Sequence, residues 1–196
     1  MREHDDGAGR PAVFLDRDGT ICDEVGYLNH ISRLRVFPFA ADAIARLNRA
    51  GLPVVVVTNQ SGVARRIFPE SLVIEVQSRI EAELASGGAH IDGFYFSPHI
   101  KDQQCDCRKP LPGMLMRAAR EHDLDLGRSV VVGDRYADVA MAHAAGALGL
   151  LVKTGYGRGD FEYHSKEWPR QPDSVVEDLE AATEWILRVF APRAAR

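Results

Sequence analysis

The sequence predicts an α/β protein with a doubly wound parallel sheet, a Rossmann-like arrangement. Short apolar runs rich in β-branched and aromatic residues lack polar alternation, and segments with helical spacing separate them. Strands that are apolar on both faces and alternate with helices are typical of a parallel sheet covered on both sides. A chain of 196 residues, 45% of them hydrophobic, can bury one core. We therefore expect a single domain over residues 11–190, between a disordered tail at 1–10 and a C-terminal tail at 191–196.

Each predicted strand is a short apolar run bounded by turn residues. The runs are AVFLD (12–16), LPVVVVT (52–58), IDGFYFS (91–97), SVVVGD (129–134) and ALGLLV (147–152). Helices are expected between them, at roughly 39–50, 69–86, 112–122 and 135–145. SVVEDLEAATEWILRVF predicts one more short strand and a final helix, whereas GYGRGD (155–160) is interpreted as a loop. Residues 19–38 are too few for a cap domain, so we expect a small flap there.

Charge and composition exclude several functional classes. The formal net charge is −4, with both signs interspersed, which argues against a nucleic-acid partner. The N-terminal stretch MREHDDGAGRP lacks the apolar region of a signal peptide, and no run approaches the roughly 18 apolar residues of a membrane helix. Three cysteines do not make a disulfide framework, which favours a reducing compartment. We expect a cytoplasmic monomer with no membrane partner.

Polar side chains follow the predicted strands at their carboxyl ends, where ligands bind in such sheets. Asp16 and Asp18 follow the first strand, Thr58 the second and Asp134 the fourth, while Lys109 ends the loop after the third. Oxygen ligands from the three aspartates suit Mg²⁺, which accepts phosphate oxygens. Lys109 and Thr58 supply a cation and a hydroxyl for the same phosphate. One carboxylate can attack phosphorus and another can transfer protons.

Each of these motifs also has a structural explanation when taken alone. Asp-x-Asp and GDRYAD can form turns or helix caps, TNQSG can be an ordinary β-to-α turn, and Lys109 can be a solvated loop charge. Their joint occurrence at successive strand ends favours a phosphate-processing enzyme. A non-catalytic phosphate-binding protein on the same fold is the alternative from another class.

Four motifs resemble those of the haloacid dehalogenase superfamily of phosphohydrolases, namely FLDRDGT, VVVTNQSG, the lysine of CRKP, and VVGDRYAD. The resemblance extends from about residue 11 to 190 and looks closest to the D,D-heptose 1,7-bisphosphate phosphatases, through DRDGT, TNQSGVAR and the CDCRKPLPGM segment. It implies a phosphoric monoester hydrolase that removes the 7-phosphate of D-glycero-D-manno-heptose 1,7-bisphosphate, for lipopolysaccharide synthesis. Histidinol-phosphate phosphatases are close relatives, and their substrate stays open as an alternative.

The resemblance implies a role for each matching acidic residue. Asp16 would be the nucleophile and a Mg²⁺ ligand. Asp18 would be the general acid and base, with its backbone carbonyl on the metal. Asp134 would complete the Mg²⁺ site, and Asp138 would orient it.

Contacts to a phosphorylated sugar are also implied by the resemblance. Thr58 and Lys109 would hold the transferring phosphoryl group. Arg108 and Arg135 would bind the second phosphate, a task for which the guanidinium fork is better suited than an ammonium group. The full set of predicted substrate contacts is Glu24, Val25, Gly26, Tyr27, Thr58, Asn59, Gln60, Ser61, Arg108, Lys109 and Arg135.

The stretch SPHIKDQQCDCRKP (97–110) looks like a zinc site that lacks one ligand. Relatives with a structural zinc carry Cys-x-His followed by Cys-x-Cys, and here Ser97 replaces the first cysteine, which leaves His99, Cys105 and Cys107. Structural zinc sites are almost always four-coordinate, and a serine hydroxyl is a poor ligand beside a thiolate. We interpret the loop as the remnant of a zinc site that still aims the following Arg-Lys pair into the active site.

Overall fold

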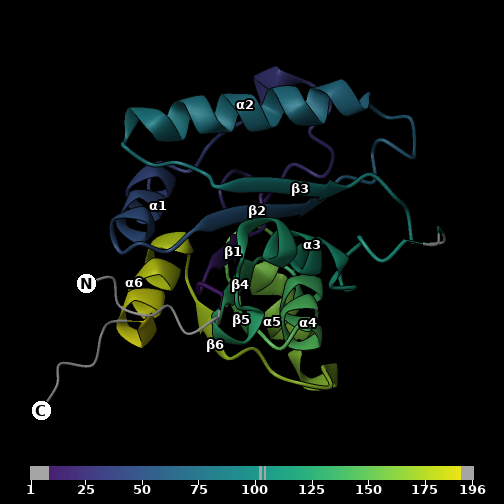
Figure 1. Cartoon of the computed structure of the whole chain (residues 1–196). Coiled ribbons are helices and arrows are strands. Elements are labelled where there is room, and N and C mark those ends of the chain that lie inside the picture. The colour runs from purple at the N-terminus through teal and green to yellow at the C-terminus, as the bar shows by residue number, and fades with distance from the viewer. Residues whose placement is uncertain (1–8, 102, 104, 191–196) are drawn as a thin grey trace, which may run out of the picture.

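The computed structural model describes residues 9–101, 103 and 105–190, and it contains a parallel sheet between two layers of helices (Figure 1). The strands are β1 (Val13–Leu15), β2 (Val54–Asn59), β3 (Gly93–Ser97), β4 (Val130–Gly133), β5 (Leu148–Val152) and β6 (Ser174–Val176). Their order in the sheet is β3-β2-β1-β4-β5-β6, and all pairs are parallel. The predicted doubly wound α/β fold is confirmed.

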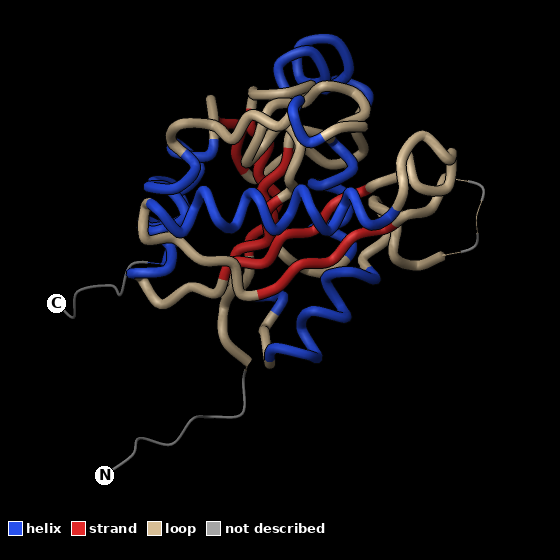
Figure 2. The backbone as a smooth tube through the Cα atoms, turned by 90° about the horizontal axis from the view of Figure 1, so that it is seen from above, coloured by secondary structure: helices blue, strands red, loops and turns tan. Residues whose placement is uncertain are grey.

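Helices cover both faces of this sheet, as the blue and red segments of Figure 2 show. Side chains of α1, α2 and α6 join one buried cluster with Val13 and Leu15 of β1, whereas those of α3 and α4 join a second cluster with Phe14. Successive strand residues point to opposite faces, so a strand between two helix layers is apolar throughout. The helices are α1 (Ala40–Arg49), α2 (Glu70–Ser86), α3 (Gly113–His122), α4 (Tyr136–Ala144), α5 (Gly157–His164) and α6 (Leu179–Phe190), with short 3₁₀ turns η1 (Ile31–Arg33), η2 (Leu126–Arg128) and η3 (Ser165–Glu167).

Residues 157–160 of the segment interpreted as a loop (155–160) belong instead to helix α5, so that interpretation was wrong for them. The eight residues of α5 include two glycines, which are poor helix formers, so local propensity does not predict a helix there. Packing supplies the missing stabilisation. The ring of Phe161 lies 6.3 Å from that of Trp168, and Trp168 stacks on Tyr136 of α4 with 4.5 Å between ring centres. Short helices depend on such tertiary contacts.

Residues 19–38 form the expected flap in place of a cap domain. Cys22 makes backbone bridges to Asp18 and to Val36, which closes the flap onto the end of β1. Leu28 and Leu34 anchor it because both are buried in the cluster under α1 and α2. The flap residues that reach the carboxyl edge of the sheet are 24–28, which lead up to the first of these anchors.

The expected terminal tails lie mostly outside the described residues. Within the stretch 1–10, the backbone of Arg10 donates to Asp123 and accepts from Asp125, at 2.9 Å in each case. The backbone is thus already part of the fold at Arg10. Among the helices of the described part, none combines the length and the apolar character that a membrane crossing requires.

Candidate active site

A cavity of about 390 Å³ opens at the carboxyl edge of the sheet, beside β1 and β4. The strand order reverses direction between these two strands, and ligands bind at this switch point in doubly wound sheets. All residues predicted for the site line the cavity. They are Asp16, Asp18, Glu24, Val25, Gly26, Tyr27, Thr58, Asn59, Gln60, Ser61, Arg108, Lys109, Asp134 and Arg135.

The buried ammonium group of Lys109 links two carboxylates at the base of this cavity. Lys109 Nζ lies 2.8 Å from Asp16 Oδ1 and 2.5 Å from Asp138 Oδ1. Burial lowers the pKa of Lys109, but the two carboxylates outweigh burial and hold the pKa above its usual value. Lys109 therefore stays charged beside the atoms that the sequence assigns to phosphoryl transfer.

Three buried carboxylates gather around the same point. Oxygens of Asp16, Asp134 and Asp138 all lie within 4.8 Å of one another. Burial raises the pKa of Asp16 to about 7, against the opposing effect of Lys109, and burial together with Asp16 and Asp138 raises that of Asp134 to about 9. When fully ionised, the three carboxylates would carry more negative charge than Lys109 balances. Oxygen donors in this arrangement fit a hard divalent cation such as Mg²⁺.

The carboxylate of Asp18 faces away from this cluster and toward Arg17. Arg17 donates from Nη2 to Asp18 Oδ2 at 2.8 Å and from Nε at 3.2 Å, and Gln60 Nε2 donates to the same oxygen at 2.8 Å. Arg17 is only 1% exposed, and charged residues are almost never buried to this extent unless they are paired, as Arg17 is with Asp18. Sequence reasoning did not single out Arg17, because an arginine between two aspartates gives no sign of whether it points inward.

Asn59 and Gln60, at the carboxyl end of β2, hold other site residues in place by hydrogen bonds. Gln60 Nε2 also donates to Thr58 Oγ1 at 2.9 Å, so Gln60 links the predicted phosphate-binding hydroxyl to Asp18. Asn59 Oδ1 accepts from the backbone N–H of Lys109 at 3.1 Å. Asn59 therefore holds the loop that carries the lysine, in addition to lining the cavity.

The two predicted phosphate-binding arginines lie on the cavity wall. Arg108 Nη1 donates to the backbone oxygen of His99 at 2.9 Å, and burial together with the nearby charge of Arg65 lowers the pKa of Arg108. Arg135 follows β4 and stacks on Tyr156, a cavity residue that the sequence did not point to. Burial also raises the pKa of Glu24 on the flap, against the opposing charge of Arg135.

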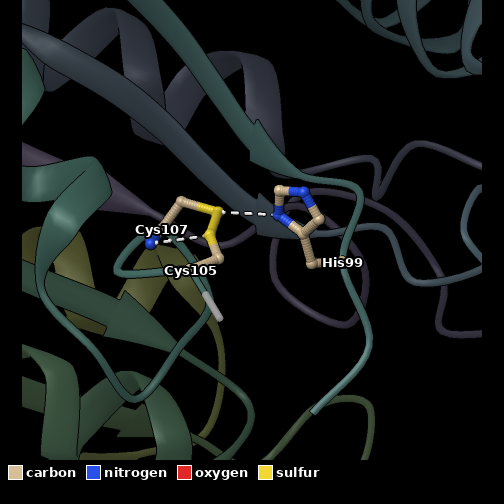
Figure 3. Close-up of side chains that lie close together, drawn as sticks. All are labelled: His99, Cys105 and Cys107. Carbon is tan, nitrogen blue, oxygen red and sulfur yellow. Dashed lines mark hydrogen bonds between the residues drawn. A yellow bond between two sulfur atoms is a disulfide. The ribbon is translucent and has the colours of Figure 1, made fainter. Parts of the chain in front are cut away.

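The zinc-like residues come together on the loop after β3 (Figure 3). His99 Nδ1 lies 3.1 Å from Cys107 Sγ, and Cys107 Sγ lies 3.2 Å from Ser97 Oγ. Cys105 and Cys107 are joined in a disulfide, whereas the sequence analysis foresaw none, and Cys22 is a buried free thiol. Ligand atoms of His99, Cys105 and Cys107 lie within 4.8 Å of one another, so with both cysteines reduced the loop offers three zinc ligands, one fewer than a structural site uses.

Comparison with known proteins places the chain among hydrolases. The family model described as haloacid dehalogenase-like hydrolase matches residues 20–143, and a second, HAD-hydrolase-like model matches residues 106–182. D-glycero-D-manno-heptose-1,7-bisphosphate 7-phosphatase of Thermosynechococcus vestitus is 43% identical, over 94% of this chain and 99% of the relative. D-glycero-beta-D-manno-heptose-1,7-bisphosphate 7-phosphatase of Yersinia pestis is 36% identical, over 92% of each chain.

Solved structures give the same result. The crystal structure of D,D-heptose 1,7-bisphosphate phosphatase from B. bronchiseptica complexed with magnesium and phosphate has a TM-score of 0.84 and 36% identity, over 91% of this chain and 99% of that chain. A putative HAD-like phosphatase from Mesorhizobium loti has a TM-score of 0.72 and 35% identity, over 96% and 90%. These similarities confirm the resemblance that the four motifs indicated.

Proposed function

Because the chain belongs to the haloacid dehalogenase-like hydrolase family, we propose that it removes the 7-phosphate of D-glycero-D-manno-heptose 1,7-bisphosphate, with Mg²⁺ and through an aspartyl-phosphate. It is a phosphoric monoester hydrolase, as its relatives are. The 1-phosphate product would serve nucleotide-heptose and lipopolysaccharide synthesis. We further propose that the enzyme works in the cytoplasm as a monomer.

Two cationic regions of one cavity carry this proposal. Lys109 lies beside Asp16 at the base, and Arg108 and Arg135 lie on the wall. A guanidinium group binds phosphate through parallel donors, so the wall suits a second phosphate. Histidinol phosphate, the alternative substrate, carries a cationic amine that these arginines would repel.

The residues of the base support a two-step transfer. Asp16 would attack the phosphorus of the 7-phosphate as the bond from phosphorus to the C7 oxygen breaks, and Asp18 would give its proton to that oxygen. Asp18 would then take a proton from water, whose oxygen attacks the aspartyl-phosphate and releases phosphate and the Asp16 carboxylate. Thr58 and Lys109 would bind the phosphoryl oxygens in both steps. Asp18 lines the cavity, and hydrogen bonds from Arg17 and Gln60 hold its carboxyl group there.

The acidic cluster would hold the metal ion. Asp16, Asp134 and the backbone carbonyl of Asp18 are the proposed ligands, supported by the crowding of buried carboxylate oxygens at this point. When bound, Mg²⁺ would neutralise charge on the phosphoryl oxygens. Asp138 would remain the partner of Lys109.

The test is phosphate release in the presence of Mg²⁺ from both anomers of the heptose bisphosphate and from histidinol phosphate, compared as kcat/KM. A preference for the heptose of about 100-fold is expected, which corresponds to about 2.7 kcal/mol. Asp16→Asn is the blank, and Asp23→Asn, an exposed flap carboxylate, is the matched control. A preference for histidinol phosphate would assign the alternative substrate, and no release from any of them would contradict phosphatase function.

A further inference from the structure

Tyr156 stands on the cavity wall immediately before helix α5. Its side chain is 43% exposed and lines the cavity together with Arg135. The guanidinium carbon of Arg135 lies 4.1 Å from the centre of the Tyr156 ring. A cation is attracted to the face of an aromatic ring, and a planar guanidinium stacked on a ring has a fixed orientation.

Asp160, one helical turn further along α5, holds Arg135 from another direction. Its Oδ2 lies 3.4 Å from Arg135 Nε. Among the hydrogen bonds and ion pairs of the described residues, Arg135 uses neither Nη1 nor Nη2. The terminal pair of donors, which matches two oxygens of a phosphate, is therefore available to a ligand in the cavity.

The turn that carries Tyr156 is fixed to the proposed metal ligand. Tyr156 N donates to Asp134 Oδ2 at 2.8 Å, and Thr154 Oγ1 donates to Gly19 O at 2.5 Å. Gly155 has a φ of +54° and approaches Asp134 so closely that a Cβ would overlap the carboxylate. The backbone that carries the Tyr156 side chain is thus fixed relative to Asp134.

From this arrangement we infer that Tyr156 makes the site selective for a second phosphate. Its ring holds the guanidinium of Arg135 in the orientation that binds the distal phosphate while the other phosphate reacts at Asp16. Tyr156 acts through Arg135 and does not touch the reacting atoms, so it is a positioning residue. The inference deepens the proposed function and rests on it.

The experiment compares kcat/KM for the heptose 1,7-bisphosphate with that for the heptose 7-phosphate, which lacks the distal phosphate. In Tyr156→Leu the ratio of the two values is expected to fall about tenfold, mainly through KM for the bisphosphate. Tyr156→Phe keeps the ring and is expected to keep the ratio. Tyr163→Leu removes a tyrosine of helix α5 that is 77% exposed, and is the matched control.

A double variant tests the route of the effect. Adding Tyr156→Leu to Arg135→Ala is expected to lower the ratio no further than Arg135→Ala alone, because residues that act through one contact are not additive. The inference would be overturned if the losses of the two single variants add in the double variant, or if Tyr156→Leu leaves the ratio unchanged. It would also be overturned if Tyr156→Leu lowers kcat/KM equally for both substrates, since equal losses indicate a structural effect on Asp134. If the wild-type enzyme does not prefer the bisphosphate, the proposed function fails and this inference fails with it.

Discussion

Lys109 Nζ donates a hydrogen bond to Asp138 Oδ1 at 2.5 Å, which joins the loop after β3 to helix α4. The other oxygen of Asp138 accepts from the backbone N–H of Arg135 at 3.2 Å and so caps this helix. The family resemblance implied that Asp138 orients the metal site. In the structure it also fixes the position of the proposed phosphate-binding cation.

Asp138→Asn is expected to lower kcat/KM for phosphate release by about 100-fold, because one of the two counter-charges of buried Lys109 is lost. Replacing a charge-assisted hydrogen bond by a neutral one is expected to lower the free energy of unfolding by about 1–3 kcal/mol. Steady-state kinetics and urea denaturation measure the two effects. Asp178→Asn is the control, because Asp178 accepts from Ala181 N at the start of α6 and does not line the cavity. Full activity in Asp138→Asn would show that the charge of Asp138 is not needed to position Lys109.

Arg17→Met is expected to reduce kcat by 10-fold or more while changing KM little. Asp18 would keep the hydrogen bond from Gln60 but lose the bidentate partner that sets its resting orientation. Loss of one member of a buried ion pair is also expected to cost about 3 kcal/mol of stability. Arg79→Met, which breaks an exposed pair with Glu83, is the control for stability, and a change of less than about 1 kcal/mol is expected there. Unaltered kcat in Arg17→Met would show that Asp18 needs no such support.

The metal-free protein is expected to lose stability as the pH rises from about 4 to 9. The folded-state pKa values of Asp16 and Asp134, about 7 and about 9, lie above the ordinary 3.8, so folding favours the protonated forms. Their contribution is therefore complete below pH 4 and is lost as each group ionises. Mg²⁺ should then raise the melting temperature of protein treated with a chelator more at pH 8.5 than at pH 5.5. Equal shifts at the two pH values would contradict a site built on these carboxylates.

The purified chain is expected to retain no stoichiometric zinc after dialysis under reducing conditions. Ser97→Cys should supply the fourth ligand, a third thiolate, because Ser97 Oγ already lies 3.2 Å from Cys107 Sγ, and this variant is expected to bind about one zinc per chain. Elemental analysis measures both. Ser86→Cys, on an exposed helix end, controls for binding by an unrelated thiol. Stoichiometric zinc in the wild-type chain would make the loop a working metal site.

The fold and the floor of the site could be predicted because they depend on patterns that are local in sequence. Apolar runs without alternation specify parallel strands, and the carboxyl ends of such strands meet at one edge, which brings Asp16, Thr58 and Asp134 together. The burial of Arg17 and the stack of Arg135 on Tyr156 depend on contacts between separate segments. Helix α5 was not predicted because its glycines oppose a helix that only packing stabilises.

The groups proposed to react and the groups proposed to contact the rest of the substrate come from different parts of the fold. Leu15 of β1 pairs with Val132 of β4, so Asp16 and Asp134 continue from the two innermost strands of the sheet. Glu24, Arg108 and Tyr156 come instead from peripheral connections. Exchanges of these three side chains would change what the cavity offers to a substrate, while Asp16 and Asp134 keep their places. Such a division makes the scaffold suited to gene duplication followed by divergence, and it identifies the flap, which carries none of the reacting groups, as the segment to graft when a new substrate is wanted.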